Sequence, residues 1–207
     1  MWYLCRQPHF RISGTKCLRN GTFLGLDNLR ELYIPANSIT CVDPGGFGGL
    51  RKIESITLNM NRIEEINAGV FGELCKDDFE VSCKNVTSSE YCNGTNALTT
   101  LKYLNLASNN INRIHRFAFV SCETLETLVL YGNWLLSLDE TFLYTPGLKS
   151  LHLMACGIGN IPNNAFECTP MLSELHIGDN DKINKLPVDA LRFLRNLRTI
   201  EDRCEEK

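Results

Sequence analysis

The sequence predicts an α/β repeat protein in which short coils stack into a curved solenoid, with a parallel inner β-sheet and an irregular or short-helical outer side. A string of apolar residues recurs, each copy contains an alternating apolar pair, and a polar residue or cysteine follows each pair. The copies begin at Leu29, Ile53, Leu101, Leu125, Leu148 and Leu172, and a partial one begins at Leu197. Their starts lie 24, 48, 24, 23, 24 and 25 residues apart.

The alternating pair predicts a short strand in each copy. Leu32 and Ile34 are two positions apart in the first copy, as are Leu128 and Leu130 in a later one. Side chains at this spacing lie on one face of a strand. Because one coil cannot bury that face alone, we expect the coils to share a core and their strands to form a parallel sheet.

Two further columns run through the copies. A polar column, where the chain leaves the sheet, is expected to satisfy backbone groups of neighbouring coils. It consists of Asn37, Asn61, Asn109, Asn133, Cys156 and Asn180. On the outer side we expect large apolar residues to fill the core, namely Phe47, Phe71, Phe119, Phe142 and Phe166, with Leu191 in the sixth copy.

The pattern divides one predicted domain, residues 1–207, into four parts. Residues 1–28 form an irregular first coil, 29–74 hold two repeats, and 98–207 hold four repeats and a partial last coil. Residues 75–97 are interpreted as a degenerate repeat or insertion, in which Phe79, Val81 and Val86 can furnish a weak strand. The segment is either a partner-binding arm or a tolerated surface insertion, and the second interpretation is favoured.

The repeat of about 24 residues, Leu-x-x-Leu-x-Leu-x-x-Asn with a later Phe, resembles the "typical" extracellular leucine-rich repeat subfamily. Toll-type receptors, Slit-like guidance proteins and variable lymphocyte receptors share it. The resemblance covers residues 29–74 and 98–200, and residues 1–28 in part. It implies a recognition module outside the cell, with a role in innate immune or developmental signalling.

Cysteines and glycosylation sequons also favour the secretory pathway. The chain has ten cysteines, and Asn20, Asn85 and Asn93 each begin an Asn-x-Thr sequon. No signal peptide is evident at the amino terminus and no apolar run is long enough to cross a membrane. We therefore expect part of a longer ectodomain, or a short secreted form that buries its open end in a dimer.

The cysteines predict a partial disulfide framework. Cys5 and Cys17 bracket the first coil and are candidates for a capping disulfide. Cys75, Cys83 and Cys92 allow one internal pair, and the third cysteine either pairs with Cys41 or stays free. Cys122 and Cys156 are expected to be buried free thiols. The partners of Cys168 and Cys204 are left open.

The predicted ligand site is the concave face of the sheet, where strand residues between the buried ones point to solvent. Aromatic and apolar residues gather there in the third to fifth clear copies, and such side chains are frequent in binding hot spots. The candidate ligand-binding residues are Tyr33, Tyr103, Asn105, Val129, Tyr131, Trp134, His152, Met154 and His176. The alternative is a scattered surface, or contact with a missing coil.

His152 and His176 fall at equivalent positions of neighbouring copies. Glu174, Asp179 and Asp181 lie nearby in the sequence. The favoured interpretation of this group is an ordinary solvated surface, followed by a pH-sensitive ligand contact and then by a metal site. No metal site is predicted, because two histidines and flexible carboxylates are a weak metal signature.

The sequence shows no constellation for catalysis, since its serines lie in turns and the inner sheet is open to water. A net charge of −3 offers no basic face for nucleic acid or anionic lipid. We therefore expect a non-enzymatic module without a cofactor that binds a protein or a microbial or matrix ligand. The alternative is a secreted structural or adhesion protein without a signalling role.

Overall fold

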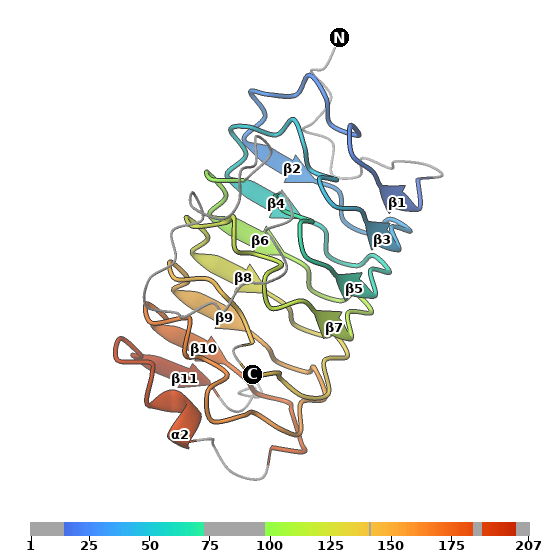
Figure 1. The fold of residues 1–207 in the computed structure, drawn as a ribbon. Coiled ribbons are helices and arrows are strands. Elements are labelled where there is room, and N and C mark those ends of the chain that lie inside the picture. The colour runs from blue at the N-terminus through green and yellow to red at the C-terminus, as the bar shows by residue number, and fades with distance from the viewer. Residues whose placement is uncertain (1–14, 73–97, 141, 184–187, 202–207) are drawn as a thin grey trace, which may run out of the picture.

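The computed structural model describes residues 15–72, 98–140, 142–183 and 188–201. Seven parallel strands form one sheet in the order β11-β10-β9-β8-β6-β4-β2, so the strands follow the chain from one end of the stack to the other (Figure 1). They are β2 (Glu31–Tyr33), β4 (Ser55–Thr57), β6 (Tyr103–Asn105), β8 (Thr127–Val129), β9 (Ser150–His152), β10 (Glu174–His176) and β11 (Thr199–Glu201). The predicted parallel-strand solenoid is confirmed.

Each of these strands is three residues long, and in six of the seven its central side chain is buried. The register keeps equivalent positions side by side: Leu104 pairs with Leu128, and Leu128 with Leu151. The apolar pair of each copy therefore points into one core shared by all the coils, as the alternation predicted.

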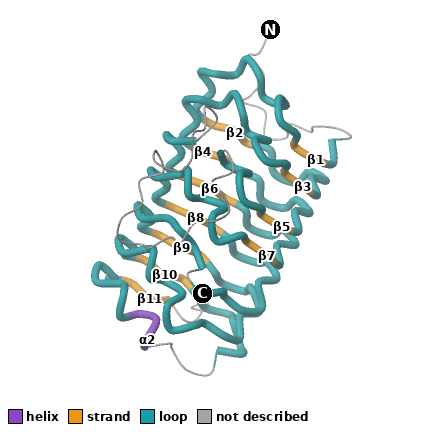
Figure 2. The backbone as a smooth tube through the Cα atoms, in the orientation of Figure 1, coloured by secondary structure: helices purple, strands orange, loops and turns teal. Residues whose placement is uncertain are grey.

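The outer side is mostly loop (Figure 2). Two small parallel sheets lie there, one pairing β1 (Cys17–Leu18) with β3 (Cys41–Val42) and the other pairing β5 (Glu65–Ile66) with β7 (Arg113–Ile114). The one helix among the described residues is α2 (Val188–Leu191), whose Ala190 is buried. Leu191 itself is partly buried and packs against the core.

Phenylalanine rings fill the outer part of the core as predicted. Phe47 and Phe71 are 1% and 0% exposed, and their ring centroids lie 5.2 Å apart at an interplanar angle of 6°. Phe23 extends this stack on one side and Phe119 on the other. The repeated ring thus links at least four successive coils by aromatic contact.

The polar column is a hydrogen-bond ladder between coils. Asn109 Nδ2 donates to the carbonyls of Leu58 (3.1 Å) in the preceding coil and Leu106 (3.0 Å) in its own. Its Oδ1 accepts a bond from the Ile63 N–H at 3.1 Å. Because these backbone groups are buried, each side-chain amide satisfies groups that would otherwise be desolvated without a partner.

Cys156 is a weaker rung, because a thiol can replace the donor of asparagine but offers only a weak acceptor. Its Sγ donates to the carbonyl of Leu130 at 3.2 Å. In the preceding coil the Leu136 N–H bonds to the Cys156 carbonyl at 3.3 Å. The ladder therefore changes its pattern at this coil.

The strands on either side of residues 75–97 are neighbours in the main sheet. β4 pairs directly with β6, in the register Ser55 with Tyr103 and Thr57 with Asn105. Residues 75–97 lie outside the described residues. The weak strand expected there falls in this part of the chain, and the 48-residue spacing separates two coils that are adjacent in the sheet.

Candidate ligand-binding face

The candidate site is the surface of the seven-stranded sheet that points away from the core, here called the sheet face. In the strands, the residues on either side of the buried central position lie on it. Val129 on β8 is the register partner of His152 on β9, which is in turn the partner of His176 on β10. Neighbouring strands are about 4.8 Å apart, so these side chains form one continuous row.

The structure brings five of the nine predicted ligand residues together on β8, β9, β10 and the residues just after them. We call these residues the central patch: Val129, Tyr131, His152, Met154 and His176. Tyr131 is 41% exposed, and the other four are half-buried. Rigid aromatic and apolar side chains with partial exposure can contact a partner at low entropic cost.

Tyr103 and Asn105 adjoin the central patch on β6. Asn105 Nδ2 donates to the Tyr103 hydroxyl at 3.3 Å, and Asn105 Oδ1 accepts from the Ala107 N–H at 2.9 Å. These contacts fix the orientation of both side chains, so they present a defined polar surface beside the patch.

Tyr33 and Trp134 are not part of the central patch. Tyr33, 52% exposed, lies on β2, separated from β8 by β4 and β6. Trp134 follows the ladder residue Asn133, and its backbone N–H donates to the Ile111 carbonyl, which puts it beyond the edge of the sheet. Its side chain is 62% exposed, and Leu136, two residues later, is 54% exposed.

His152 and His176 stack face to face, with ring centroids 4.2 Å apart and an interplanar angle of 2°. His152 Nε2 lies 3.1 Å from Ser150 Oγ, and His176 Nδ1 lies 2.5 Å from Glu201 Oε2. Partial burial and the neighbouring His176 lower the pKa of His152, against a smaller opposing effect of Glu174 and Glu201. The pair therefore favours a neutral His152 beside a His176 that is hydrogen-bonded to a carboxylate.

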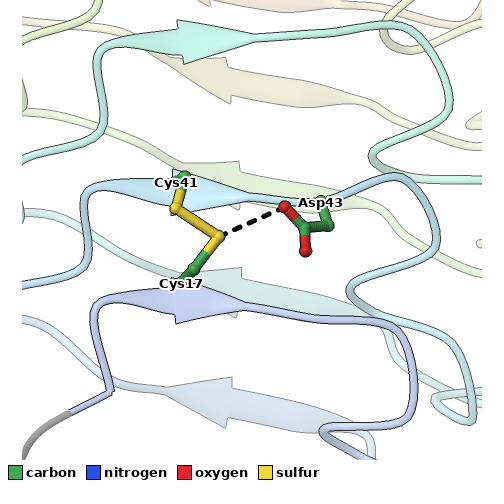
Figure 3. Close-up of side chains that lie close together, drawn as sticks. All are labelled: Cys17, Cys41 and Asp43. Atoms are coloured by element: carbon green, nitrogen blue, oxygen red, sulfur yellow. Dashed lines mark hydrogen bonds between the residues drawn. A yellow bond between two sulfur atoms is a disulfide. The ribbon is translucent and has the colours of Figure 1, made fainter.

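In the described part of the chain, the histidine pair and its carboxylates do not bring three ligand atoms within 4.8 Å of one another. The group that does is Cys17, Cys41 and Asp43 (Figure 3). The two sulfurs of that group are joined in a disulfide, so neither is available as a thiolate ligand.

The Cys17–Cys41 disulfide corrects two expectations. Cys17 is not bonded to Cys5, and Cys41 is not available to Cys75, Cys83 or Cys92. The reason is the register: Cys17 on β1 faces Cys41 on β3, and their Cα atoms are 4.6 Å apart, within the range for a disulfide. Cys5, Cys75, Cys83 and Cys92 themselves lie outside the described residues.

The remaining described cysteines are buried. Cys122 and Cys156 are free thiols, as predicted, and burial raises the pKa of Cys122 to about 12. Cys168 is disulfide-bonded and 2% exposed. The cysteine partner of Cys168 lies outside the described residues.

Asn20 is exposed on the turn that follows β1, on the small-sheet side of the coils. The hydroxyl of Thr22, the last residue of its sequon, donates to the Arg19 carbonyl at 2.7 Å. Asn85 and Asn93 lie outside the described residues. Asn20 is the sequon whose surroundings the structure describes, and it is not on the sheet face.

A cavity on the flank of the coils was missed by sequence reasoning. It has a volume of about 340 Å³ and is lined by residues including Arg113, Ile114, Leu135, Asp139 and Phe142. The copy that begins at Leu125 is one residue short between Leu138 and Phe142, and Ser137 bridges to Asn160 instead of pairing with β7. The single spacing of 23 was the signal that could have located it.

Family models match both parts of the chain. A leucine rich repeat model matches residues 13–74, and a model of a BspA type leucine rich repeat region with six copies matches residues 92–204, more than half of the chain. This chain belongs to the leucine-rich repeat family. Leucine-rich repeat families are generally non-catalytic protein-interaction modules.

A curated relative is similar over a shorter stretch. The transforming growth factor beta activator LRRC33 of Danio rerio is 30% identical over 111 residues, which cover 49% of this chain and 16% of the relative. The chain thus matches less than a fifth of that protein's length. No helix among the described residues is long and apolar enough to span a membrane.

Proposed function

We propose that this leucine-rich repeat chain is a non-catalytic extracellular recognition module, part of a receptor ectodomain, that binds a protein ligand on its sheet face. The observation that carries the proposal is the central patch, where partly exposed aromatic, apolar and imidazole side chains from three adjacent strands form one surface. Family membership supports a protein ligand, and the similarity to a transforming growth factor beta activator of Danio rerio supports testing transforming growth factor beta first.

The extracellular location is supported by three features. The chain carries a disulfide between adjacent coils, a third disulfide-bonded cysteine, Cys168, and an exposed sequon at Asn20. Disulfides and accessible sequons are typical of proteins that mature in the secretory pathway.

The test is a binding screen with the chain secreted from a glycosylating host. Recombinant transforming growth factor beta and a panel of other recombinant extracellular proteins are the probes, measured by biolayer interferometry. We expect a partner whose affinity falls about tenfold or more with Tyr131→Ala or Met154→Ala, since truncating a hot-spot side chain costs about 2 kcal/mol.

The matched control is Leu24→Ala, which removes another highly exposed apolar side chain, 74% exposed, from the first described coil. It should leave the affinity unchanged. A partner that responds equally to all three substitutions, or to none of them, contradicts the proposed face.

A further inference from the structure

Charged side chains are distributed unevenly between the sheet face and its rim. The rim row is made by the residue that precedes each strand: Arg30, Glu54, Lys102, Glu126, Lys149, Ser173 and Arg198. Most of its cations are in ion pairs, since Glu54 contacts both Arg30 and Lys102, and Lys149 contacts Glu126 at 2.9 Å. Lys102 and then Arg30 lower the pKa of Glu54, so this carboxylate stays charged.

The sheet face inside this rim row is negatively charged. Three rows make it up: the first residue of each strand, the third residue of each strand, and the residue two positions after the strand. Among the described residues of these rows, the charged ones are Glu31, Glu174 and Glu201, and none is Lys or Arg. Arg203, which continues the third row in the sequence, lies outside the described residues.

Two of the three carboxylates border the central patch. Glu174 is exposed at the start of β10, and Glu201 ends β11, where it accepts a hydrogen bond from His176. Tyr131 and Met154 lie two residues after the adjacent strands β8 and β9. The surface therefore offers carboxylates at one end and an apolar aromatic area at the other.

This arrangement selects the partner by charge. An anionic ligand would approach these carboxylates, and the described residues of the face include no Lys or Arg to neutralise them. Bringing like charges together on binding costs free energy. A lysine or arginine would find a carboxylate for its charged head and an aromatic face for its aliphatic stem. A partner rich in such residues is also drawn to the face by long-range attraction.

We infer that the sheet face docks a protein surface that presents Lys or Arg to Glu174 and Glu201, beside an apolar side chain that packs on Tyr131 and Met154. Anionic polymers such as sulfated glycans and nucleic acids are excluded from this face. The inference rests on the proposed function, because it specifies the partner of the same face.

The test uses an unbiased displayed peptide library, selected on the secreted chain at pH 7.4. A blocking variant, Val129→Asn with Tyr131→Thr, places an Asn-x-Thr sequon across Leu130 and thus a glycan in the central patch. Peptides that bind the wild type but not the glycosylated blocking variant report on the face. The same variant after enzymatic glycan removal, together with its melting temperature, separates obstruction from misfolding.

We expect the face-directed peptides to be enriched about threefold in Lys and Arg over Asp and Glu relative to the input library, as electrostatic complementarity requires. Their affinity should fall about fivefold with Glu174→Gln and Glu201→Gln combined, and more steeply in higher salt. Glu64→Gln, which changes an exposed glutamate outside the face, should leave it unchanged.

The outcomes separate the two proposals. Face-directed peptides without this enrichment, or with the same affinity for the Glu174→Gln/Glu201→Gln variant, overturn the inference about charge and leave the proposed function standing. A selection that yields no peptide sensitive to the blocking glycan overturns both.

Discussion

At the residue scale, the stability of the coils depends on buried polar side chains that serve two coils at once. Asn61, Asn109, Asn133 and Asn180 are 3% to 6% exposed, and each bonds backbone groups of its own coil and of a neighbour. A side chain of this kind cannot be shortened without leaving buried backbone groups unsatisfied. The repeated asparagine is therefore explained by hydrogen bonding between coils and not by ligand binding.

The first prediction concerns this ladder. Asn109→Ala removes bonds to Leu58, Leu106 and Ile63 and should lower the free energy of unfolding by about 2–4 kcal/mol. Urea titration followed by circular dichroism measures the change. Asn110→Ala, at the exposed neighbouring position, should change it by less than about 0.5 kcal/mol. Equal effects of the two substitutions would contradict the ladder.

The second prediction concerns pH. The pKa of His152 is lowered from its ordinary value of 6.5 by partial burial and by His176, so the unfolded chain binds a proton there more readily than the folded chain. The contribution of neutral His152 to the free energy of unfolding is therefore fully present above pH 6.5. It is lost as the pH falls towards the lowered pKa of the folded state.

The measurement is the fall in melting temperature between pH 7.5 and pH 5. His152→Gln cannot titrate, so this fall should be smaller in the variant than in the wild type. Glu174, His176 and Glu201 remain in both proteins, so the titratable group that the substitution removes is His152. An equal or larger fall in the variant would show that His152 is not held in its neutral form.

At the element scale, the strands and the outer loops differ in how far the sequence predicts them. The buried centres of the strands follow from alternation, and Phe47, Phe71, Phe119, Phe142 and Phe166 are all buried as expected. The small outer sheets and the short coil after Leu138 were not predicted, because two-residue strands carry too few side chains for a period-two pattern.

The sequence also did not predict the backbone conformation just before the polar column. The residue just before each position of the polar column has a positive φ, between 51° and 68°, in all six copies. These residues are Ala36, Met60, Ser108, Gly132, Ala155 and Asp179. Only Gly132 adopts this conformation without strain, and Asp179 is of a type that tolerates it, so composition gave no repeated signal for it. Stacking and the ladder hydrogen bonds hold the other five there.

The third prediction concerns the joined outer strands β1 and β3. Cys17 and Cys41 are 24 residues apart, and a cross-link over a loop of this length stabilises a fold by about 3 kcal/mol through the entropy of the unfolded chain. The double substitution Cys17→Ser/Cys41→Ser should lower the free energy of unfolding by about 3 kcal/mol and speed amide hydrogen exchange at Leu18 and Val42. Exchange at Leu151 and Leu175 should be little changed, because each coil contacts chiefly its neighbours. Loss of protection throughout the described coils would contradict this local role.

At the scale of the whole molecule, fold and candidate site were predictable to different extents. The strand order follows from the repeats, because each coil must pack on the next. Register then placed Val129, His152 and His176 side by side, as their equivalent positions implied. Sequence could not show the stacking of the two histidine rings or the bond from His176 to Glu201, because side-chain conformations are not determined by repeat position.

The separation of Tyr33 and Trp134 from the central patch has a geometric cause. Tyr33 shares a repeat position with Val129, but two strands lie between them. Trp134 is close to Tyr131 in sequence, but the chain has already left the sheet at Asn133. A site on a solenoid depends both on the position within a repeat and on which coils are neighbours.

The most direct test of the sheet face as the binding surface is the affinity of a partner identified in the extracellular panel for the glycosylated Val129→Asn/Tyr131→Thr variant. Affinity should fall at least about thirtyfold against the wild type, because a glycan on β8 obstructs the centre of the contact. Asn20→Gln, which removes the sequon on the small-sheet side, should leave affinity unchanged. Unaltered binding to the folded, glycosylated β8 variant would place the partner on another surface and contradict the account.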